Sequence, residues 1–146
     1  TKNQNRAYMT LPYHSFGKKE KICSLKLIQR LFAEGKSMVK YPLRVSQITL
    51  DELPENVSCQ VLVSVSKKKF KRANKRNRIK RQIREAYRLN KHLLDEALQA
   101  TGKKMALAFI YIPTEEISTA EIEKAMIKAL LQLKETLRLP KNIDFF

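Results

Sequence analysis

The chain has 146 residues, with 30 Lys and Arg against 14 Asp and Glu, so its formal net charge at pH 7 is +16. Hydrophobic residues make up 43% of it, which suffices for the core of one small domain and excludes an intrinsically disordered protein. Three Gly and five Pro exclude collagen-like and low-complexity classes, and no apolar run approaches the roughly 20 residues that cross a bilayer.

The N-terminal part of the chain is predicted to contain a loose tail and one helix. Residues 1–16 are polar and show no periodicity, so we expect them to precede a single folded domain over 17–146. A helix is predicted from Ser24 to Glu34, because Ser24 suits an N-cap and apolar residues recur at helical spacing after it. Gly35 stands where many helices end in a left-handed residue.

Two strands are predicted after this helix. The stretch Leu43–Leu50 leans towards β structure and follows Pro42, while residues 51–56 have the composition of a turn. Over Val57–Ser66, apolar residues alternate with mostly small polar ones, which predicts a strand with one buried face. The sequence is also compatible with a further short strand near Ser37–Lys40.

The second half of the chain is predicted to contain a long helix over 73–100, a buried strand over 105–112 and a last helix with a capping box at Ser118–Glu121 and a stop at Pro140. One stripe of the long helix is apolar, namely Ile79, Ile83, Ala86, Leu94 and Ala97. The opposite arc consists of Asn77, Arg78, Arg81, Arg84, Arg88 and Lys91. The element order predicts an α/β (α+β) two-layer sandwich, with three helices and a small mixed sheet of three or four strands.

The excess charge is concentrated between Lys67 and Lys91. Thirteen Lys and Arg residues in this segment face a single acidic residue, Glu85, so the segment carries +12 of the total charge. Such density calls for a polyanionic partner, either nucleic acid or an anionic membrane surface. We favour nucleic acid, because the apolar stripe of Ile and Ala suits packing on a sheet, whereas a membrane-surface helix needs bulkier apolar residues.

The pattern favours RNA over DNA. A basic leucine zipper would need apolar heptads after the basic region, but this helix is followed by Gly102 and a strand. A helix-turn-helix protein would have few strands, whereas RNA-binding proteins often combine a charged helix with a sheet. A structural RNA-binding protein of the ribosomal type stays open as the main alternative, and a DNA-binding or membrane-surface module as a third.

We predict no catalytic residue and no metal ligand in the protein itself. Glu85 is spaced to form an ion pair with Arg81 or Arg88 on the same helix. Neither histidine belongs to a recognisable nucleophile motif, and the chain has no Gly-rich phosphate loop. Cys23 and Cys59 form no metal motif or disulfide framework, and we expect two reduced packing cysteines in a cytoplasmic protein.

The basic segment resembles the signature of the bacterial ribonuclease P protein subunit. The resemblance rests on Arg76-Asn77-Arg78-Ile79-Lys80-Arg81 at the start of a long helix, after a strand that leads through Ser66 to Lys67-Lys68. The stretches Phe16–Glu20 and Leu31–Ser37 are also similar to that family, and the likeness covers roughly residues 16–138.

The resemblance implies a ribosomal protein S5 domain 2-like fold with a left-handed βαβ crossover. It also implies a subunit that binds the catalytic RNA of ribonuclease P and the 5′ leader of precursor tRNA. No obligate protein partner is evident from the sequence, and we expect none. The RNA carries out Mg²⁺-dependent removal of the leader and holds most of the Mg²⁺. The residues expected at the RNA are Lys67, Lys68, Arg72, Arg76, Asn77, Arg78, Lys80, Arg81, Arg84 and Arg88.

In the resembled family the leader groove lies between the first helix and the sheet. The resemblance makes Phe32, Ser46, Ile48 and Ser64 candidates for this groove. Phe32 matches an aromatic position of the family, but its spacing fits a core residue equally well. Ile28 stands where some members of the family have a second aromatic residue.

Overall fold

The computed structural model describes residues 16–53 and 57–138. In chain order the elements are η2 (Lys18–Glu20), α2 (Leu25–Glu34), β1 (Lys36–Lys40), β2 (Leu43–Leu50), β3 (Cys59–Ser64), α3 (Ala73–Asn90), α4 (His92–Thr101), β4 (Lys104–Tyr111) and α5 (Thr119–Arg138). Most of the predicted tail, part of the predicted turn over 51–56, and Pro140 lie outside the described residues.

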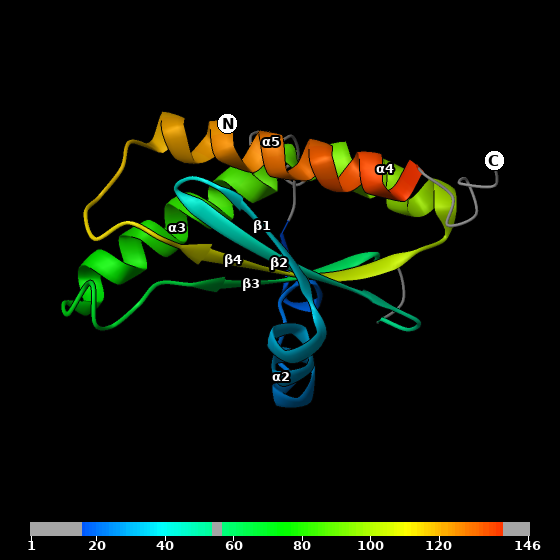
Figure 1. Cartoon of the computed structure of the whole chain (residues 1–146), viewed down its shortest axis with the longest axis horizontal. Coiled ribbons are helices and arrows are strands. Elements are labelled where there is room, and N and C mark those ends of the chain that lie inside the picture. Colours follow the sequence, from blue (N-terminus) through cyan, green and yellow to red (C-terminus); the bar gives the residue numbers. More distant parts are fainter. Residues whose placement is uncertain (1–15, 54–56, 139–146) are drawn as a thin grey trace, which may run out of the picture.

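The four strands form one open mixed sheet in the order β1-β2-β4-β3. β1, β2 and β4 pair antiparallel, whereas β3 pairs parallel to β4 and reaches it through α3 and α4. Helices α3, α4 and α5 lie on one side of the sheet, and α2 projects from the other (Figure 1). The predicted α+β architecture is confirmed, including the short first strand. The handedness of the β3–β4 crossover stays a prediction of the family resemblance.

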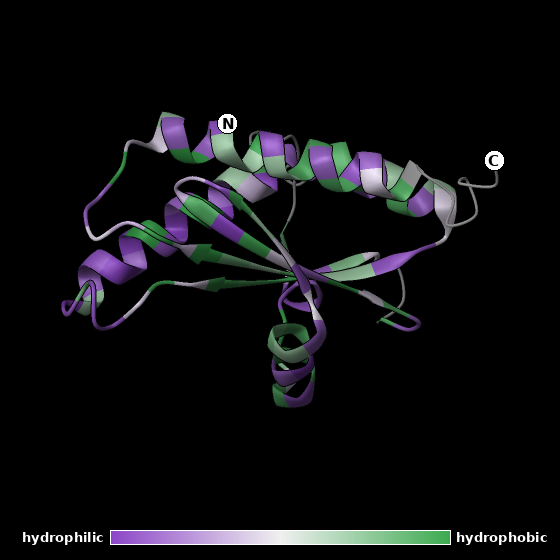
Figure 2. Cartoon of the chain, viewed as in Figure 1, coloured by the Kyte–Doolittle hydropathy of each residue, from purple (hydrophilic) through white to green (hydrophobic). Residues whose placement is uncertain are grey.

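Each face of the sheet buries its own apolar cluster. The alternating residues of β3 obey the prediction, because Cys59, Val61 and Val63 are buried under the helices, whereas the residues between them are half-buried. The other face carries the small side chains Ala106 and Ala108, which together with the fully buried Leu31 of α2 form a second cluster. Figure 2 shows β3 and most of β4 as hydrophobic, whereas hydrophobic and hydrophilic residues alternate along the helices.

A single residue explains how helix α2 begins, and another explains how it ends. The Ser24 hydroxyl accepts a hydrogen bond from the Leu27 N–H at 3.3 Å, as expected of an N-cap. The prediction of a left-handed Gly35 is wrong, because its φ of −68° and ψ of 149° are extended. Glycine is required there by space, since a Cβ atom would lie 2.2 Å from the Leu31 carbonyl oxygen and 3.0 Å from that of Gln47.

We therefore expect Gly35→Ala to destabilise the protein by about 1–3 kcal/mol, the usual cost of forcing extra atoms into a packed site. Gly17→Ala is the matched control, because its Cβ would have no neighbour within 4 Å and its φ of −89° suits any residue. Urea unfolding followed by circular dichroism measures both variants. Equal stabilities would contradict the clash at Gly35.

The long helix predicted over 73–100 is divided at Lys91 into α3 and α4, so the described residues form four α-helices where three were expected. The apolar stripe of α3 is buried as predicted, but beyond the break the core residues are Leu94 and Leu98, and Ala97 is only half-buried. Lys91, predicted on the cationic arc, is 2% exposed and forms an ion pair with Glu20 of η2. Helical spacing could not reveal this partner, which lies 71 residues away.

The segment before α2 is fixed to the sheet and to α3. The ring of Phe16, which the sequence assigned to the tail, packs edge-on against Tyr87 with centroids 5.4 Å apart. The Ile22 N–H donates to the Val61 carbonyl at 3.1 Å. Together with the Glu20–Lys91 ion pair, these contacts explain why η2 lies beside β3.

The two cysteines behave differently from each other. Cys59 is buried and reduced, and burial raises the pKa of its thiol to about 12, so the prediction of a packing residue is confirmed there. Cys23 is also reduced but exposed, because it precedes α2 outside the hydrophobic core, so the same prediction is wrong for this residue.

Asp95 is an acidic residue in an unfavourable place on α4. Burial raises the pKa of its carboxyl from 3.8 to about 6, and the nearby Glu20 adds to the rise, while Lys91 and His92 oppose it. A carboxyl that is harder to ionise in the folded state binds more protons there than in the unfolded chain. Asp95 therefore lowers stability above its folded pKa, and this penalty disappears as the pH falls towards its unfolded pKa.

We expect Asp95→Asn to stabilise the protein by about 2–3 kcal/mol at neutral pH and to have no effect near pH 4. The amide keeps the shape of the side chain but carries no charge to desolvate. Urea unfolding of the wild type and the variant at both pH values measures the difference. A less stable variant at neutral pH would show that attraction to Lys91 outweighs the burial of the carboxylate.

Candidate functional site

The loop between β3 and α3 presents the first part of the basic segment to solvent. The Ser66 hydroxyl accepts hydrogen bonds from the backbone N–H groups of Lys68 and Lys69, at 3.2 and 3.4 Å, and so turns the chain. Phe70 is 6% exposed and packs against Tyr111, with ring centroids 5.8 Å apart. This buried ring anchors the loop. The lysines around it are exposed, and the Lys69 ammonium group donates to the Ile112 carbonyl at the end of β4.

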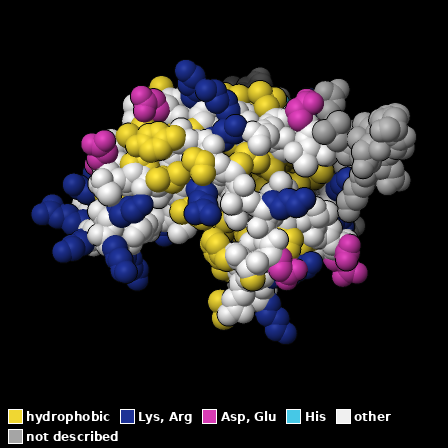
Figure 3. Space-filling view, viewed as in Figure 1, with side chains coloured by type: hydrophobic (Ala, Val, Ile, Leu, Met, Phe, Trp, Pro, Cys, Tyr) yellow, Lys and Arg dark blue, Asp and Glu magenta, His cyan; other side chains and the backbone are white. Residues whose placement is uncertain are grey.

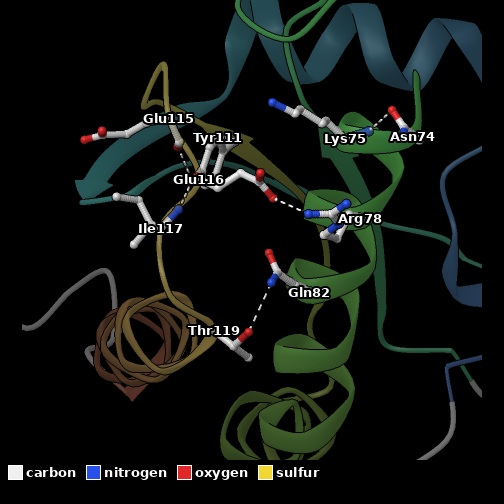
Figure 4. A network of polar contacts seen from close by, with 9 residues as sticks. All are labelled: Asn74, Lys75, Arg78, Gln82, Tyr111, Glu115, Glu116, Ile117 and Thr119. Carbon is white, nitrogen blue, oxygen red and sulfur yellow. Dashed lines mark hydrogen bonds and ion pairs between the residues drawn. The ribbon is translucent and has the colours of Figure 1, made fainter. Parts of the chain in front are cut away.

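In each arginine of the Arg-Asn-Arg motif, one guanidinium nitrogen is bound to another part of the protein. Arg76 Nη1 donates to the carbonyl oxygens of Phe70 and Lys71, at 2.8 and 2.9 Å. Arg78 Nη1 lies 3.1 Å from Glu116 Oε1 (Figure 4). Among the described residues, nothing accepts a hydrogen bond from Nε or Nη2 of either arginine. Each side chain is therefore oriented in advance while keeping donors for a ligand.

The remaining predicted residues of α3 divide into exposed and engaged side chains. Asn77, Arg81 and Arg84 are exposed, and their spacing places them on one face of the helix. Arg88 is half-buried and forms the predicted ion pair with Glu85 through two guanidinium nitrogens. This pairing lowers the pKa of the Glu85 carboxyl, so Arg88 is already partly neutralised.

The predicted cations gather at the end of the molecule where α3 begins, and Figure 3 shows Lys and Arg side chains crowded there. We call this region the cationic surface and define it as Lys67, Lys68, Arg72, Arg76, Asn77, Arg78, Lys80, Arg81 and Arg84. Its members extend from the loop and from more than one side of α3. The surface is therefore broader than the single helical arc that the sequence predicted.

The loop that follows β4 borders this surface and was not singled out from the sequence. The Tyr111 hydroxyl donates to the Glu115 carbonyl at 2.7 Å and accepts from the Ile117 N–H at 2.8 Å. A cavity of about 360 Å³ separates this loop from the start of α3. It is lined by Lys69, Phe70, Lys71, Arg72, Lys75, Thr114, Glu115 and Glu116. The signal available in the sequence was an adjacent acidic pair, Glu115 and Glu116, shortly after the buried strand that ends at Tyr111.

The four candidates for the leader groove differ in accessibility. Ser46, Ile48 and Ser64 all belong to the sheet face that carries α2. Ser46 is 7% exposed and therefore buried, and Ile48 is partly buried because it packs against the cluster beneath α2. Ser64 is half-buried at the end of β3, whereas Phe32 is 51% exposed and is not a core residue. Ile28, by contrast, packs against the α2 cluster.

The described residues do not fit a metal centre held by the protein. Over 16–53 and 57–138, no group of three or more His, Cys, Asp and Glu side chains is placed to hold an ion. Within the same ranges, none of the helices combines the length and apolarity needed to cross a membrane. The exposed cations at the start of α3 are suited to binding a polyanion through guanidinium and ammonium groups.

Two curated proteins are similar to the chain over most of their length. The ribonuclease P protein component of Porphyromonas gingivalis is 43% identical over 122 residues, covering 84% of this chain and 88% of that protein. The protein of the same name from Chlorobaculum tepidum is 38% identical over 117 residues, covering 71% and 75%.

Solved structures share the fold. The RNase P protein of Staphylococcus aureus gives a TM-score of 0.63 at 23% identity, covering 82% of this chain and 99% of that one. The RNase P protein of Thermotoga maritima gives 0.62 at 19% identity, covering 77% and 96%. In addition, residues 16–134 match the family model described as Ribonuclease P. The chain therefore belongs to the ribonuclease P protein family.

Proposed function

We propose that this chain is the protein subunit of ribonuclease P, binding the catalytic RNA and the 5′ leader of precursor tRNA. In this role it assists the Mg²⁺-dependent endonucleolytic removal of the leader in the cytoplasm, and the RNA performs the chemistry. The observation that carries the proposal is the Arg-Asn-Arg motif at the start of α3, with both arginines anchored by Nη1, in a chain of this family.

The cationic surface is the proposed contact with the catalytic RNA. Guanidinium groups can bind phosphate oxygens with two parallel hydrogen bonds, and a guanidinium that is already oriented loses less rotamer entropy on binding. Arg76 and Arg78 meet this condition through their contacts to the loop carbonyls and to Glu116. Arg88 is the weakest member of the proposed site, because Glu85 already neutralises much of its charge.

The α2 face of the sheet is the proposed contact with the leader. Phe32 and Ser64 are accessible enough to touch a single strand, and Ser46 and Ile48 would form the floor beneath it. An exposed aromatic ring such as that of Phe32 suits stacking with an unpaired base. Mg²⁺ is proposed to be held by the RNA, since the described part of the protein provides no cluster of ligands for it.

Reconstitution tests this function directly. The chain is mixed with a bacterial ribonuclease P RNA and precursor tRNA at low Mg²⁺, and removal of the leader is followed with time. We expect the protein to accelerate removal, and the acceleration to weaken steeply with added salt, because RNA phosphates release counterions on binding. Tight RNA binding without acceleration would overturn the proposal and favour the alternative of a structural, ribosomal-type RNA-binding protein.

A further inference from the structure

One residue from each strand lies in a single row across the α2 face of the sheet. Arg44 of β2 pairs with Val39 of β1 on one side and with Ile110 of β4 on the other, and Ile110 pairs with Ser64 of β3. Side chains that are in register on neighbouring strands point to the same face. This face is the one that carries α2, because Ile110 alternates with Ala108 of the cluster beneath that helix. We refer to Val39, Arg44, Ile110 and Ser64 as the open row.

Helix α2 leaves the open row uncovered. The cluster beneath α2 uses the neighbouring rows, which hold Ala106 and Ala108, and among the described residues it includes no member of the open row. Val39 is 62% exposed and Arg44 is exposed as well, whereas the other two side chains of the row are half-buried. The row is therefore an accessible strip of the sheet beside α2.

Arg44 places a positive charge in the middle of this strip. Over residues 16–53 and 57–138, no group forms an ion pair or a hydrogen bond with its side chain. Its two neighbours in the row, Val39 and Ile110, are aliphatic. An exposed guanidinium group with all its N–H donors available suits a phosphate oxygen, and the aliphatic side chains beside it suit a ribose or a base.

The open row continues into the cationic surface. Ser64 is the last residue of β3, and two positions later the Ser66 hydroxyl turns the chain into the loop before α3. The Lys69 ammonium group of this loop donates to the Ile112 carbonyl, and the Ile112 N–H donates to the Pro42 carbonyl at 3.0 Å. The loop is thus tied to the ends of β2 and β4 beside the row, where β3 ends and α3 begins (Figure 1). A nucleic acid bound at the cationic surface can therefore extend along the open row.

We infer that Arg44 binds a backbone phosphate of the 5′ leader and so directs the single strand across the sheet towards β1. The catalytic RNA is proposed to lie at the cationic surface, so the leader enters the open row from Ser64. Arg44 lies two strand spacings, about 10 Å, beyond Ser64, and only a leader long enough to pass Ser64 reaches it. This inference rests on the proposed function and adds to it a contact residue on β2 and a direction for the strand.

The test varies the length of the leader. The holoenzyme is assembled from the chain and a bacterial ribonuclease P RNA. Its affinity is measured, by single-turnover leader removal at increasing enzyme concentration, for a precursor tRNA with a long leader and for the same tRNA with a single-nucleotide leader. We expect Arg44→Gln to weaken binding of the long-leader precursor about tenfold, the effect of losing one hydrogen bond to a charged group. Binding of the short-leader precursor should change less than about twofold, because a distant exposed charge is screened by salt.

A second variant and a matched control separate contact from overall charge. Arg44→Lys keeps the charge and should recover part of the loss, and circular dichroism should show an unchanged fold because Arg44 is exposed. Lys104→Gln is the control, since Lys104 pairs with Leu50 on the same face. Lys104 lies six residues from Ile110 along β4, about 20 Å away. Its replacement removes the same charge and should leave both affinities within about twofold of the wild type.

Three results would overturn the inference while leaving the proposed function standing. An equal loss for both precursors in Arg44→Gln would place Arg44 at the catalytic RNA or the tRNA body, and no loss for either would place it outside the RNA path. The same loss in Lys104→Gln would reduce the effect to overall charge. A wild-type chain that does not accelerate leader removal would instead overturn the proposed function, and this inference with it.

Discussion

Replacing both Arg76 and Arg78 by Ala is expected to weaken binding to a bacterial ribonuclease P RNA by about a hundredfold or more. Each arginine is oriented through Nη1 and keeps Nε and Nη2 for phosphate oxygens. Hydrogen bonds to charged groups contribute about 1.5–3 kcal/mol each, and the two residues act on one RNA surface. The acceleration of leader removal at low Mg²⁺ should fall with the affinity.

Dissociation constants measured over a series of salt concentrations check this result. Losing about two phosphate contacts should reduce the slope of log affinity against log salt by about two. Lys124→Ala with Lys128→Ala removes the same charge from exposed positions on α5 and should change the affinity little. Binding by the arginine variant that equals binding by this lysine control would refute the motif assignment.

A charge-preserving variant separates geometry from charge. Arg76→Lys with Arg78→Lys keeps both cations but removes the planar fork, and a lysine has a single nitrogen to serve both anchor and ligand. We expect an intermediate loss of affinity with a nearly unchanged salt slope. Circular dichroism should confirm that the fold is intact, because Arg76 also ties the loop carbonyls of Phe70 and Lys71 together.

Lys91→Met is expected to destabilise the protein by about 3–5 kcal/mol, the usual cost of breaking a buried ion pair from one side. The Lys91 side chain is 3% exposed, and that of its partner Glu20 is 18% exposed. Without the ammonium group, Glu20 loses its counter-ion and faces the carboxyl of Asp95, which already has a raised pKa. Urea unfolding followed by circular dichroism suits the measurement, since the chain contains no Trp.

The double variant Lys91→Met with Glu20→Gln identifies the cause of this loss. It removes both charges, so we expect it to recover a large share of the lost stability, as replacement of whole buried pairs commonly does. RNA binding should be unaffected in both variants at temperatures where they are folded, because Lys91 is buried away from the cationic surface. A double variant no more stable than Lys91→Met would point to lost packing of the lysine stem.

Much of the fold could be predicted from local periodicity. The alternation in β3, the apolar stripe of α3 and the Ser24 cap each depend on residues a few positions apart, and all three are present. The division of the long helix could not be predicted in this way. It coincides with Lys91, whose charge is buried because Glu20 reaches it from η2, and no local pattern encodes that meeting.

The candidate site shows the same contrast. A run of cations around Arg76 and Arg78 is visible in the sequence, as is the spacing that pairs Glu85 with Arg88. The orientation of the two guanidinium groups could not be predicted from the sequence. It depends on backbone carbonyls in the loop before α3 and on Glu116 in the loop after β4. The position of Glu115 and Glu116 beside the cations could not be predicted either, because the pairing of β4 in the sheet brings them there.

Local sequence was enough to predict most of the helices and strands, the concentration of positive charge and the family signature, because these properties depend on neighbouring residues along the chain. Three features became visible only in the folded chain: Gly35 is needed for space, Lys91 is internal, and Arg76 and Arg78 are each held by one guanidinium nitrogen. These outcomes depend on backbone and charges brought together from distant segments, and desolvation and close contact act only after those segments meet.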